Sequence, residues 1–295
     1  MSLSIGSVTP GKYILRWSLN TREHAISSCV ETERNVYMTD DEQHDHGMSG
    51  PVFAVGGPSA YDEVVRFTAA VRALRPLPEM PHPDFLLFQT LHLTAELLWY
   101  NMHFDIVRAA DDLRAGDYRS AHRLVRRATE LQRLTVTHLG QVRSGIPQTE
   151  FLQIRASLPE GGSGLDSPGM RNLQKACRHL WRCFTAAMES EGLASEVELL
   201  EADATQPQLR LVALEMLELD DALLGWQQEH QRMVWARLGG HPTLNDGRSP
   251  VSLTGRTVDV LDRFVAHMRF PRLWQAVQDY HESMAKHQAY GGTHR

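Results

Sequence analysis

Two histidines lie in stretches of sequence whose spacing gives each of them a defined set of helical neighbours. His92 shares one face of a predicted helix with Phe88, Ala95, Glu96 and Trp99, because residues three and four positions apart lie on the same side of a helix. A face that joins a histidine and a glutamate to two aromatic rings is not typical of a plain core stripe, and imidazole is suited to acid–base chemistry. The alternative is a core histidine whose polar atoms are satisfied by a neighbour.

The second histidine, His230, lies on a mostly apolar helical face. A neutral imidazole in such a place is suited to be the axial ligand of a heme iron, and Arg232 and Arg237 could pair with heme propionates. A buried structural histidine is the alternative. The face also carries Trp226, Met233 and Val234 and ends at Leu238-Gly239-Gly240, where glycine suits a helix C-terminus.

A third group of residues suits the recognition of a carboxylate. Arg155 ends the segment Phe151-Leu-Gln-Ile-Arg155 and precedes a loop rich in glycine and serine that runs to Ser167. Arginine can hold a carboxylate through two parallel hydrogen bonds, and glycines let the backbone approach a ligand closely. The alternative interpretation is that Arg155 is an ordinary charged residue on the surface of a helix.

The elements that must position these residues are helices. From residue 59 onward apolar residues recur at helical spacing, and Ser59 with Asp62 gives an N-terminal capping pattern. Four prolines between residues 76 and 83 precede the first long helix. Helices are predicted at about residues 84–115, 117–143, 148–157, 169–190, 207–239, 254–269 and 271–288. We therefore expect a mainly α fold in which residues 59–295 form one helical domain.

The first 58 residues are expected to form a separate N-terminal arm that is irregular or partly β. Residues 13–19 and 35–38 are short runs rich in aromatic and β-branched side chains, as strands are. Residues 40–47 mix carboxylates with two histidines, as a metal site does. No regular element is predicted to hold those side chains in a fixed geometry, so a solvated acidic loop is the preferred interpretation.

Composition argues against several classes of protein. The chain has 295 residues, of which 42% are hydrophobic, enough to bury a sizeable core. Its formal net charge of −6 offers no basic footprint for nucleic acid. The three cysteines lack the spacing of a zinc site or a disulfide framework. There is no secretion signal and no apolar run of the roughly 18 residues that a membrane span needs, so a cytoplasmic protein is expected.

Three segments, taken together, resemble the tryptophan 2,3-dioxygenase-like superfamily of heme enzymes. They are Phe88–Trp99, Phe151–Arg155 with the loop at residues 162–167, and Trp226–Gly239. In order and residue pattern they are similar to that family's distal helix, its substrate helix and loop, and its heme-ligand helix. The resemblance covers roughly residues 84–257, and it implies a helical bundle around one heme.

The resemblance implies a role for each residue that matches the family's pattern. His230 would be the proximal iron ligand, His92 the distal catalytic histidine beside Phe88, and Arg155 the group that holds the substrate carboxylate. Phe151 would form a wall of the pocket. The other implied contacts are with heme, through Trp226, Arg237, Ser163 and Gly164, and with substrate, through Ser252 and Thr254.

Departures from the pattern favour one branch of this superfamily. The stretch after the ligand helix lacks the Gly-Thr-Gly-Gly-Ser pattern with which tryptophan dioxygenases close over substrate, and the loop after Arg155 is one residue longer. A short chain with both histidines and no such closing loop looks like the heme-dependent L-tyrosine 3-hydroxylases of lincomycin- and anthramycin-type antibiotic biosynthesis. Some relatives attach heme through a cysteine four residues after the ligand histidine. Val234 stands at that position, so heme b is expected to be held non-covalently.

The expected reaction is hydroxylation of L-tyrosine at ring position 3, which gives L-DOPA with hydrogen peroxide as oxidant. In this reaction His92 would move the peroxide proton while Arg155 anchors the carboxylate. The alternatives are ring cleavage of tryptophan or another indole, as in the 2,3-dioxygenases, and a heme-binding sensor without catalytic activity. The expected partners are the amino acid and peroxide, with neither nucleic acid nor membrane, and family habit implies a homodimer or a higher homo-oligomer.

Overall fold

The computed structural model describes Phe53, residues 59–160, 164–201 and 205–241, Leu253 and residues 267–291. Within these ranges the secondary structure is helical and contains no strand, so the expectation of a mainly α fold is confirmed. The chain divides into two units, Met1–Pro51 and Val52–Arg295, and every described residue belongs to the second. The expected N-terminal strands, the acidic loop at residues 40–47 and the boundary at residue 58 lie outside the described residues.

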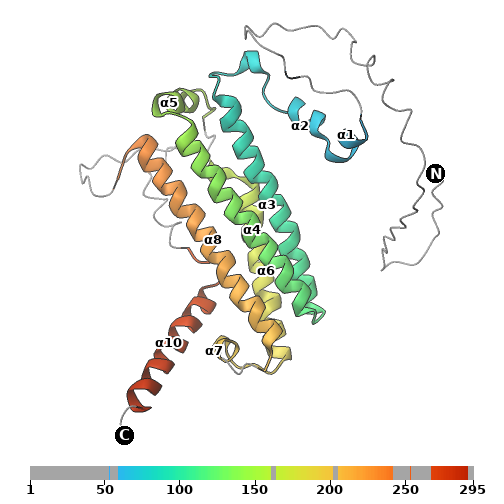
Figure 1. Cartoon of the computed structure of the whole chain (residues 1–295), viewed down its shortest axis with the longest axis vertical. Coiled ribbons are helices and arrows are strands. Elements are labelled where there is room, and N and C mark those ends of the chain that lie inside the picture. The colour runs from blue at the N-terminus through green and yellow to red at the C-terminus, as the bar shows by residue number, and fades with distance from the viewer. Residues whose placement is uncertain are drawn as a thin grey trace, which may run out of the picture. The chain divides into compact units, whose positions relative to one another are not determined.

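Four long helices form the body of the second unit (Figure 1). They are α3 (Phe85–Arg114), α4 (Tyr118–Gly145), α6 (Pro168–Ser190) and α8 (Pro207–Leu238). Helix α3 packs against α4 on one side and α6 on the other, and α4 packs in turn against α8. The predicted long helices agree with these bounds to within one or two residues.

The turn between α3 and α4 has a clear local cause. Gly116 has a positive φ of 74°, a conformation that costs other residues energy because of their Cβ atom. Asp117 then caps α4, since its carboxylate accepts a hydrogen bond from the backbone N–H of Ser120 at 3.0 Å. The chain therefore reverses within a few residues and lays α4 antiparallel to α3.

Shorter helices connect or extend the long ones. At the first of them the expected cap is confirmed, because the Ser59 hydroxyl accepts a hydrogen bond from the N–H of Asp62 at 3.1 Å. The helix is then interrupted at Arg66, whose φ is 59°, and neither of the two six-residue pieces buries a residue. The short helices are α1 (Ala60–Val65), α2 (Phe67–Arg72), η1 (Leu77–Glu79), α5 (Gln148–Ala156), η2 (Gly164–Asp166) and α7 (Glu196–Leu200).

The last described helix, α10 (Pro271–Gly291), is attached to α8 by one buried carboxylate. Asp220 accepts hydrogen bonds from the backbone N–H groups of Arg269 and Phe270 and from the indole Nε1–H of Trp274, at 2.8–3.1 Å. Of the helix expected at about residues 254–269, the part up to residue 266 lies outside the described residues. Residues 267–269 are not helical, which corrects the end of that prediction.

Two apolar clusters make up the core of the described residues. The larger lies among the long helices, and the smaller lies where α5 meets α3, α4 and α8. Trp226 packs against both, so the two clusters meet at its ring. Members of the larger cluster include Met102, Ile106, Leu124, Phe184 and Met216, and members of the smaller include Phe85, Val142, Ile154 and Met233.

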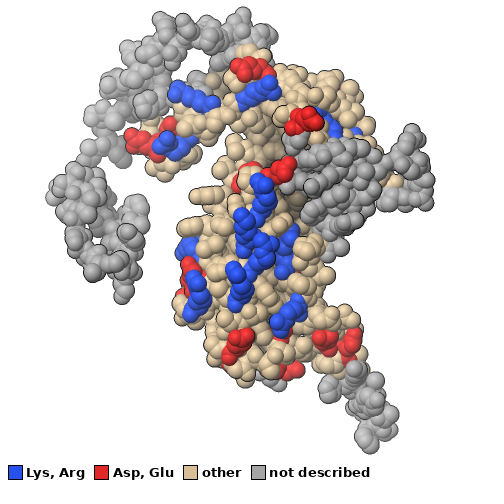
Figure 2. All heavy atoms as spheres, turned by 180° about the vertical axis from the view of Figure 1, so that it is seen from behind, with Lys and Arg blue, Asp and Glu red and all other residues tan. Residues whose placement is uncertain are grey.

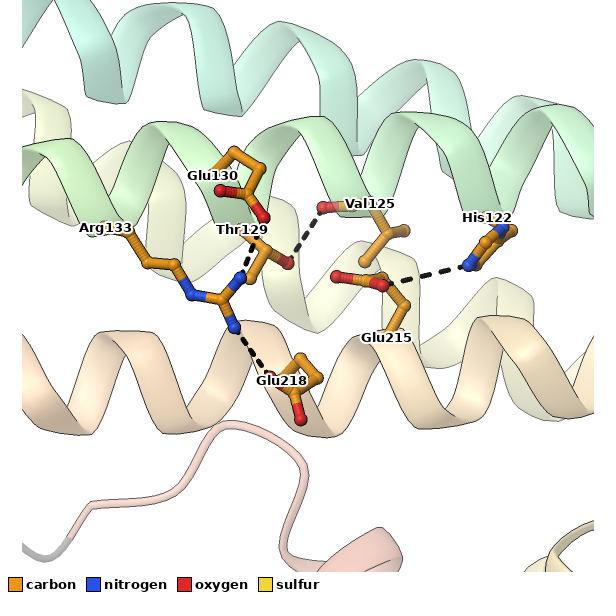
Figure 3. A network of polar contacts seen from close by, with 7 residues as sticks. All are labelled: His122, Val125, Thr129, Glu130, Arg133, Glu215 and Glu218. Carbon is orange, nitrogen blue, oxygen red and sulfur yellow. Dashed lines mark hydrogen bonds and ion pairs between the residues drawn. The ribbon is translucent and has the colours of Figure 1, made fainter.

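Polar contacts also join α4 to α8 (Figure 3). The guanidinium of Arg133 pairs with Glu130 on its own helix at 2.8 Å and with Glu218 on α8 at 2.7 Å. One end of this row is His122, whose Nε2 lies 3.7 Å from a carboxylate oxygen of Glu215. Since solvent-exposed ion pairs contribute at most about 1 kcal/mol each, the apolar clusters carry most of the stability of this helix pair. None of the described helices is long and apolar enough to cross a membrane.

Candidate functional site

A cavity opens between α3, α4, α8 and the segment around η2, beside the ring of Trp226. It contains about 570 Å³ of empty space, its open mouth included. His92 lines it from α3 and His230 lines it from α8. The wall between them is mainly apolar, formed by Leu91, Ala95, Trp99, Leu139, Val142 and Met233.

His92 is fixed by its own helix. Its ring Nδ1 lies 2.6 Å from the backbone carbonyl of Phe88, and a carbonyl oxygen only accepts hydrogen bonds. Nδ1 therefore carries the proton, and the lone pair is on Nε2. The His92 side chain is exposed and lines the cavity, and the desolvation of its ring by neighbouring protein atoms lowers its pKa below the ordinary value. At neutral pH the side chain is thus a neutral proton acceptor.

His230 lies in a more enclosed setting. Its ring stacks on that of Trp226, with centroids 5.2 Å apart and planes inclined by 14°. Burial, and to a smaller extent charge repulsion from the nearby His92, lower the pKa of His230 to about 4. A histidine held neutral in this way keeps a lone pair for a metal ion at all physiological pH values.

The available donors decide which kind of metal centre this cavity could hold. Among the described residues no group of three or more His, Cys, Asp or Glu side chains could hold a metal ion. A bare ion such as zinc needs about four ligands, most of them from the protein. A heme brings its own equatorial nitrogens and needs one axial imidazole, a ligand that His230 on the apolar wall could supply. The residues present therefore fit a heme and do not fit a bare ion.

Glu96 connects the cavity to the start of α6. One carboxylate oxygen accepts a hydrogen bond from the Ser167 hydroxyl, and the other accepts one from the N–H of Gly169 at 2.8 Å. Ser167 in turn caps α6 by accepting a hydrogen bond from the N–H of Met170 at 3.0 Å. A carboxylate is favoured here because the N-terminus of a helix carries partial positive charge. Glu96 thus holds the end of the glycine-rich segment against α3.

His138 is a cavity residue that sequence reasoning missed. It lines the cavity from α4, and its Nδ1 is buried with no hydrogen-bond partner in the described part of the chain. A buried polar atom of this kind is costly unless a ligand satisfies it. The sequence did contain a signal, since Leu131, Thr135, His138 and Val142 recur at helical spacing, and two polar residues therefore interrupt an apolar stripe.

The aromatic residues expected at the pocket lie next to the cavity. The ring of Phe88 packs against that of His92, with centroids 4.1 Å apart, and so helps to fix the orientation of the imidazole. Phe151 is buried in the smaller core cluster, together with the cavity residues Leu139, Val142 and Met233. It therefore lies behind the wall of the cavity.

The arginines expected to bind ligands do not line the described cavity. Arg155 lies half-buried in the last turn of α5, and this burial lowers the pKa of its guanidinium. Arg237 donates a hydrogen bond to the backbone carbonyl of Arg143 at the end of α4, while its Nε is buried without a partner among the described residues. Both side chains come from helices that meet at the smaller core cluster.

The glycine-rich segment is described only in part. Gly164, for which a contact with heme was predicted, lines the cavity, and so does Ser167, which was not assigned a role. Ser163, Ser252 and Thr254 lie outside the described residues.

The sequence matches no protein-family model and no curated protein. The resemblance to the tryptophan 2,3-dioxygenase-like superfamily therefore stays a prediction from three residue patterns.

Proposed function

We propose that this chain is a histidine-ligated heme enzyme that hydroxylates L-tyrosine at ring position 3, giving L-DOPA with hydrogen peroxide as oxidant. In this proposal the helices from residue 59 onward form a tryptophan-2,3-dioxygenase-like bundle around a non-covalently held heme b. One observation carries it: two histidines from helices far apart in the sequence line the same apolar cavity.

His230 is the proposed iron ligand. The ring of Trp226 stacks on its neutral imidazole. The Trp226 ring is held in turn by Trp99, which packs against it edge to face, with ring planes inclined by 82° and centroids 5.3 Å apart. This packing fixes the direction in which the imidazole donates its lone pair. Bound heme would supply the iron centre at which peroxide is activated.

His92 is the proposed proton carrier. With Nδ1 bonded to the Phe88 carbonyl, Nε2 is the atom that can accept the proton of peroxide and return it to the departing oxygen. Its lowered pKa keeps this atom unprotonated at neutral pH and ready to accept. Glu96, one turn along α3, holds the glycine-rich segment that would border the substrate.

Arg155 is the proposed anchor for the carboxylate of the amino acid. Its half-buried position suits an ionic contact, because a partly desolvated guanidinium binds a carboxylate more strongly than an exposed one does. Phe151, one turn earlier on α5, packs against residues of the cavity wall. This contact fixes the position of α5 and therefore of the Arg155 backbone. Anchoring the carboxylate would hold the ring at one place in the cavity.

The decisive experiment supplies hemin-loaded protein with L-tyrosine and peroxide in one reaction and with L-tryptophan, oxygen and a reductant in another. Mass spectrometry of the products separates the candidates. One oxygen added to tyrosine supports the hydroxylase. Two oxygens added to tryptophan would replace the proposal with a ring-cleaving dioxygenase. Heme binding without any product would favour a sensor.

Three variants test the assigned roles, with His281→Ala on the exposed surface of α10 as the control. His230→Ala should lose the heme absorption band after desalting, whereas the control keeps it. His92→Ala should keep heme and lose turnover by about a hundredfold or more. Arg155→Ala should abolish the change that tyrosine causes in the heme spectrum. Full activity in His92→Ala would refute the role given to that residue.

A further inference from the structure

His138 is the cavity histidine to which the proposed reaction gives no role. It lines the cavity from α4, and its Nδ1 is buried without a hydrogen-bond partner among the described residues. The other ring nitrogen, Nε2, is less enclosed and is therefore the atom that can meet a ligand. Polar side chains at buried positions are nearly always hydrogen-bonded in native proteins. The missing partner of His138 is thus expected in the ligand of the cavity.

Three other polar side chains of the wall are already bonded inside the protein. Glu96 and Ser167 bond to each other. The Thr135 hydroxyl, one turn before His138, donates a hydrogen bond to the backbone carbonyl of Gln132 at 2.7 Å. A hydroxyl whose hydrogen is used in this way can only accept from a ligand. His138 has no such internal bond in the described part of the chain, so its imidazole is available to a ligand.

The charge of the cavity wall indicates which kind of ligand group His138 would meet. No lysine or arginine is among the described residues that line the cavity, whereas basic side chains gather on the outer surface of the bundle, as Figure 2 shows for its back. An anion in an apolar cavity needs a counter-charge, so this wall suits neither a carboxylate nor a heme propionate. Leu139 and Val142 line the cavity from the same helix as His138. A neutral polar group on an apolar body therefore fits this part of the wall.

We propose that His138 binds the phenol oxygen of the substrate and so selects tyrosine over phenylalanine. This inference rests on the proposed function, because it takes an aromatic amino acid as the occupant of the cavity. A phenol both donates and accepts hydrogen bonds, so it can pair with Nε2 of His138 in either neutral tautomer of the imidazole. Arg155 holds the carboxylate at one end of the amino acid and His138 holds the hydroxyl at the other, which fixes the ring between them.

The first test compares ligands on the hemin-loaded wild type, with dissociation constants taken from changes in heme absorption. L-Tyrosine should bind about tenfold or more tightly than L-phenylalanine, because phenylalanine leaves the imidazole without a partner. 4-Amino-L-phenylalanine has a hydrogen-bonding group at the same place and should bind more like tyrosine. Equal affinities for tyrosine and phenylalanine overturn the phenol contact and leave the proposed function standing. A protein that binds neither amino acid refutes both.

The second test applies the same titrations to variants. His138→Leu should bind tyrosine and phenylalanine nearly equally, with the loss of affinity confined to tyrosine. His138→Gln keeps a donor and an acceptor, so it should retain part of the preference, and it replaces the leucine variant if that protein does not fold.

The matched control is His122→Leu. His122 lies on the same helix about 24 Å earlier along the axis, where it faces Glu215, so this variant should keep the wild-type ratio of affinities. An unchanged preference in His138→Leu overturns the proposal. Loss of heme from a folded His138→Leu protein also overturns it, because the residue would then act on the cofactor rather than on the substrate.

Discussion

At the scale of single residues, His92 and His230, two of the three histidines that line the cavity, are distinguished by what surrounds their rings. His92 is bound through Nδ1 to the carbonyl of Phe88, which leaves one lone pair on a defined atom. His230 is stacked on Trp226 and has its pKa lowered to about 4 by burial. Both are neutral at physiological pH, so neither brings a charge into the apolar cavity that would need a counter-ion. The surroundings therefore leave each imidazole with a lone pair that can accept a proton or bind a metal ion.

Acid should destabilise the heme-free protein through His230. Its pKa is about 4 when folded and about 6.5 when unfolded, so between these values the unfolded chain binds more protons. The full contribution to stability is present above about pH 6.5 and is lost as the pH falls towards 4, a loss on the order of 3 kcal/mol. Denaturant unfolding at about pH 7 and about pH 4.5 measures this difference. His230→Leu should lose less stability between the two conditions, and equal losses would contradict the assignment.

At the scale of the elements, the start of α6 is tightly packed against α3. A Cβ at Gly169 would lie 2.5 Å from Oε2 of Glu96 and 3.0 Å from Cβ of the buried Trp99. Alanine normally stabilises a helix by about 0.5–1 kcal/mol relative to glycine. Here overpacking, which costs about 1–3 kcal/mol, should outweigh that gain because the indole cannot move aside. Gly169→Ala is therefore expected to lower the free energy of unfolding.

The matched control for this prediction is Gly140→Ala, in the C-terminal part of α4. A Cβ at Gly140 meets no atom within 4 Å, so this variant should gain about 0.5–1 kcal/mol. Chemical denaturation of both variants and the wild type gives the comparison. A stabilised Gly169→Ala would mean that the contact with Trp99 is looser than the structure describes.

The attachment of α10 gives a second prediction for an element. Asp220→Ala removes the acceptor from three N–H donors, of which that of Phe270 is buried and the other two are partly buried, and each buried donor left unsatisfied costs about 1–3 kcal/mol. We expect a loss of more than about 2 kcal/mol in the free energy of unfolding and faster hydrogen exchange at the amides of Arg269 and Phe270. The exposed neighbour Asp221 is the control, and Asp221→Ala should change stability by less than about 0.5 kcal/mol. Unchanged exchange in Asp220→Ala would refute the anchoring role.

Sequence patterns predicted the long helices because each has an extended apolar stripe bounded by proline, glycine or a capping side chain. They also predicted the nine-residue α5, but they failed for other short elements. The break at Arg66 separates α1 from α2 although the apolar spacing continues, and α7 has only five residues, too few for a periodic pattern. In both places the outcome depends on local backbone geometry rather than on an apolar face. Such geometry leaves little trace in residue spacing.

At the scale of the whole molecule, the cavity depends on contacts that no single segment specifies. Spacing placed His92 and His230 on apolar helix faces, and only the family resemblance suggested that these faces meet. Arg155 and Phe151 were expected at the pocket but lie beside or behind its wall, because α5 packs into the smaller core cluster. The role of Glu96 was not foreseen either, since its partners are about seventy residues further along the chain.

The distance in sequence between the two histidines has a consequence for how the protein is made. Helices α3, α4 and α6 can pair before α8 has been synthesised, because α3 packs against both α4 and α6. Helix α8, which carries His230, follows on the order of ten seconds after α3 at ordinary rates of synthesis. During that interval the growing chain has the wall with His92 but not the proposed iron ligand. Cellular heme captured by the finished fold would therefore be acquired late, and heme supply would limit the yield of active protein without limiting its translation.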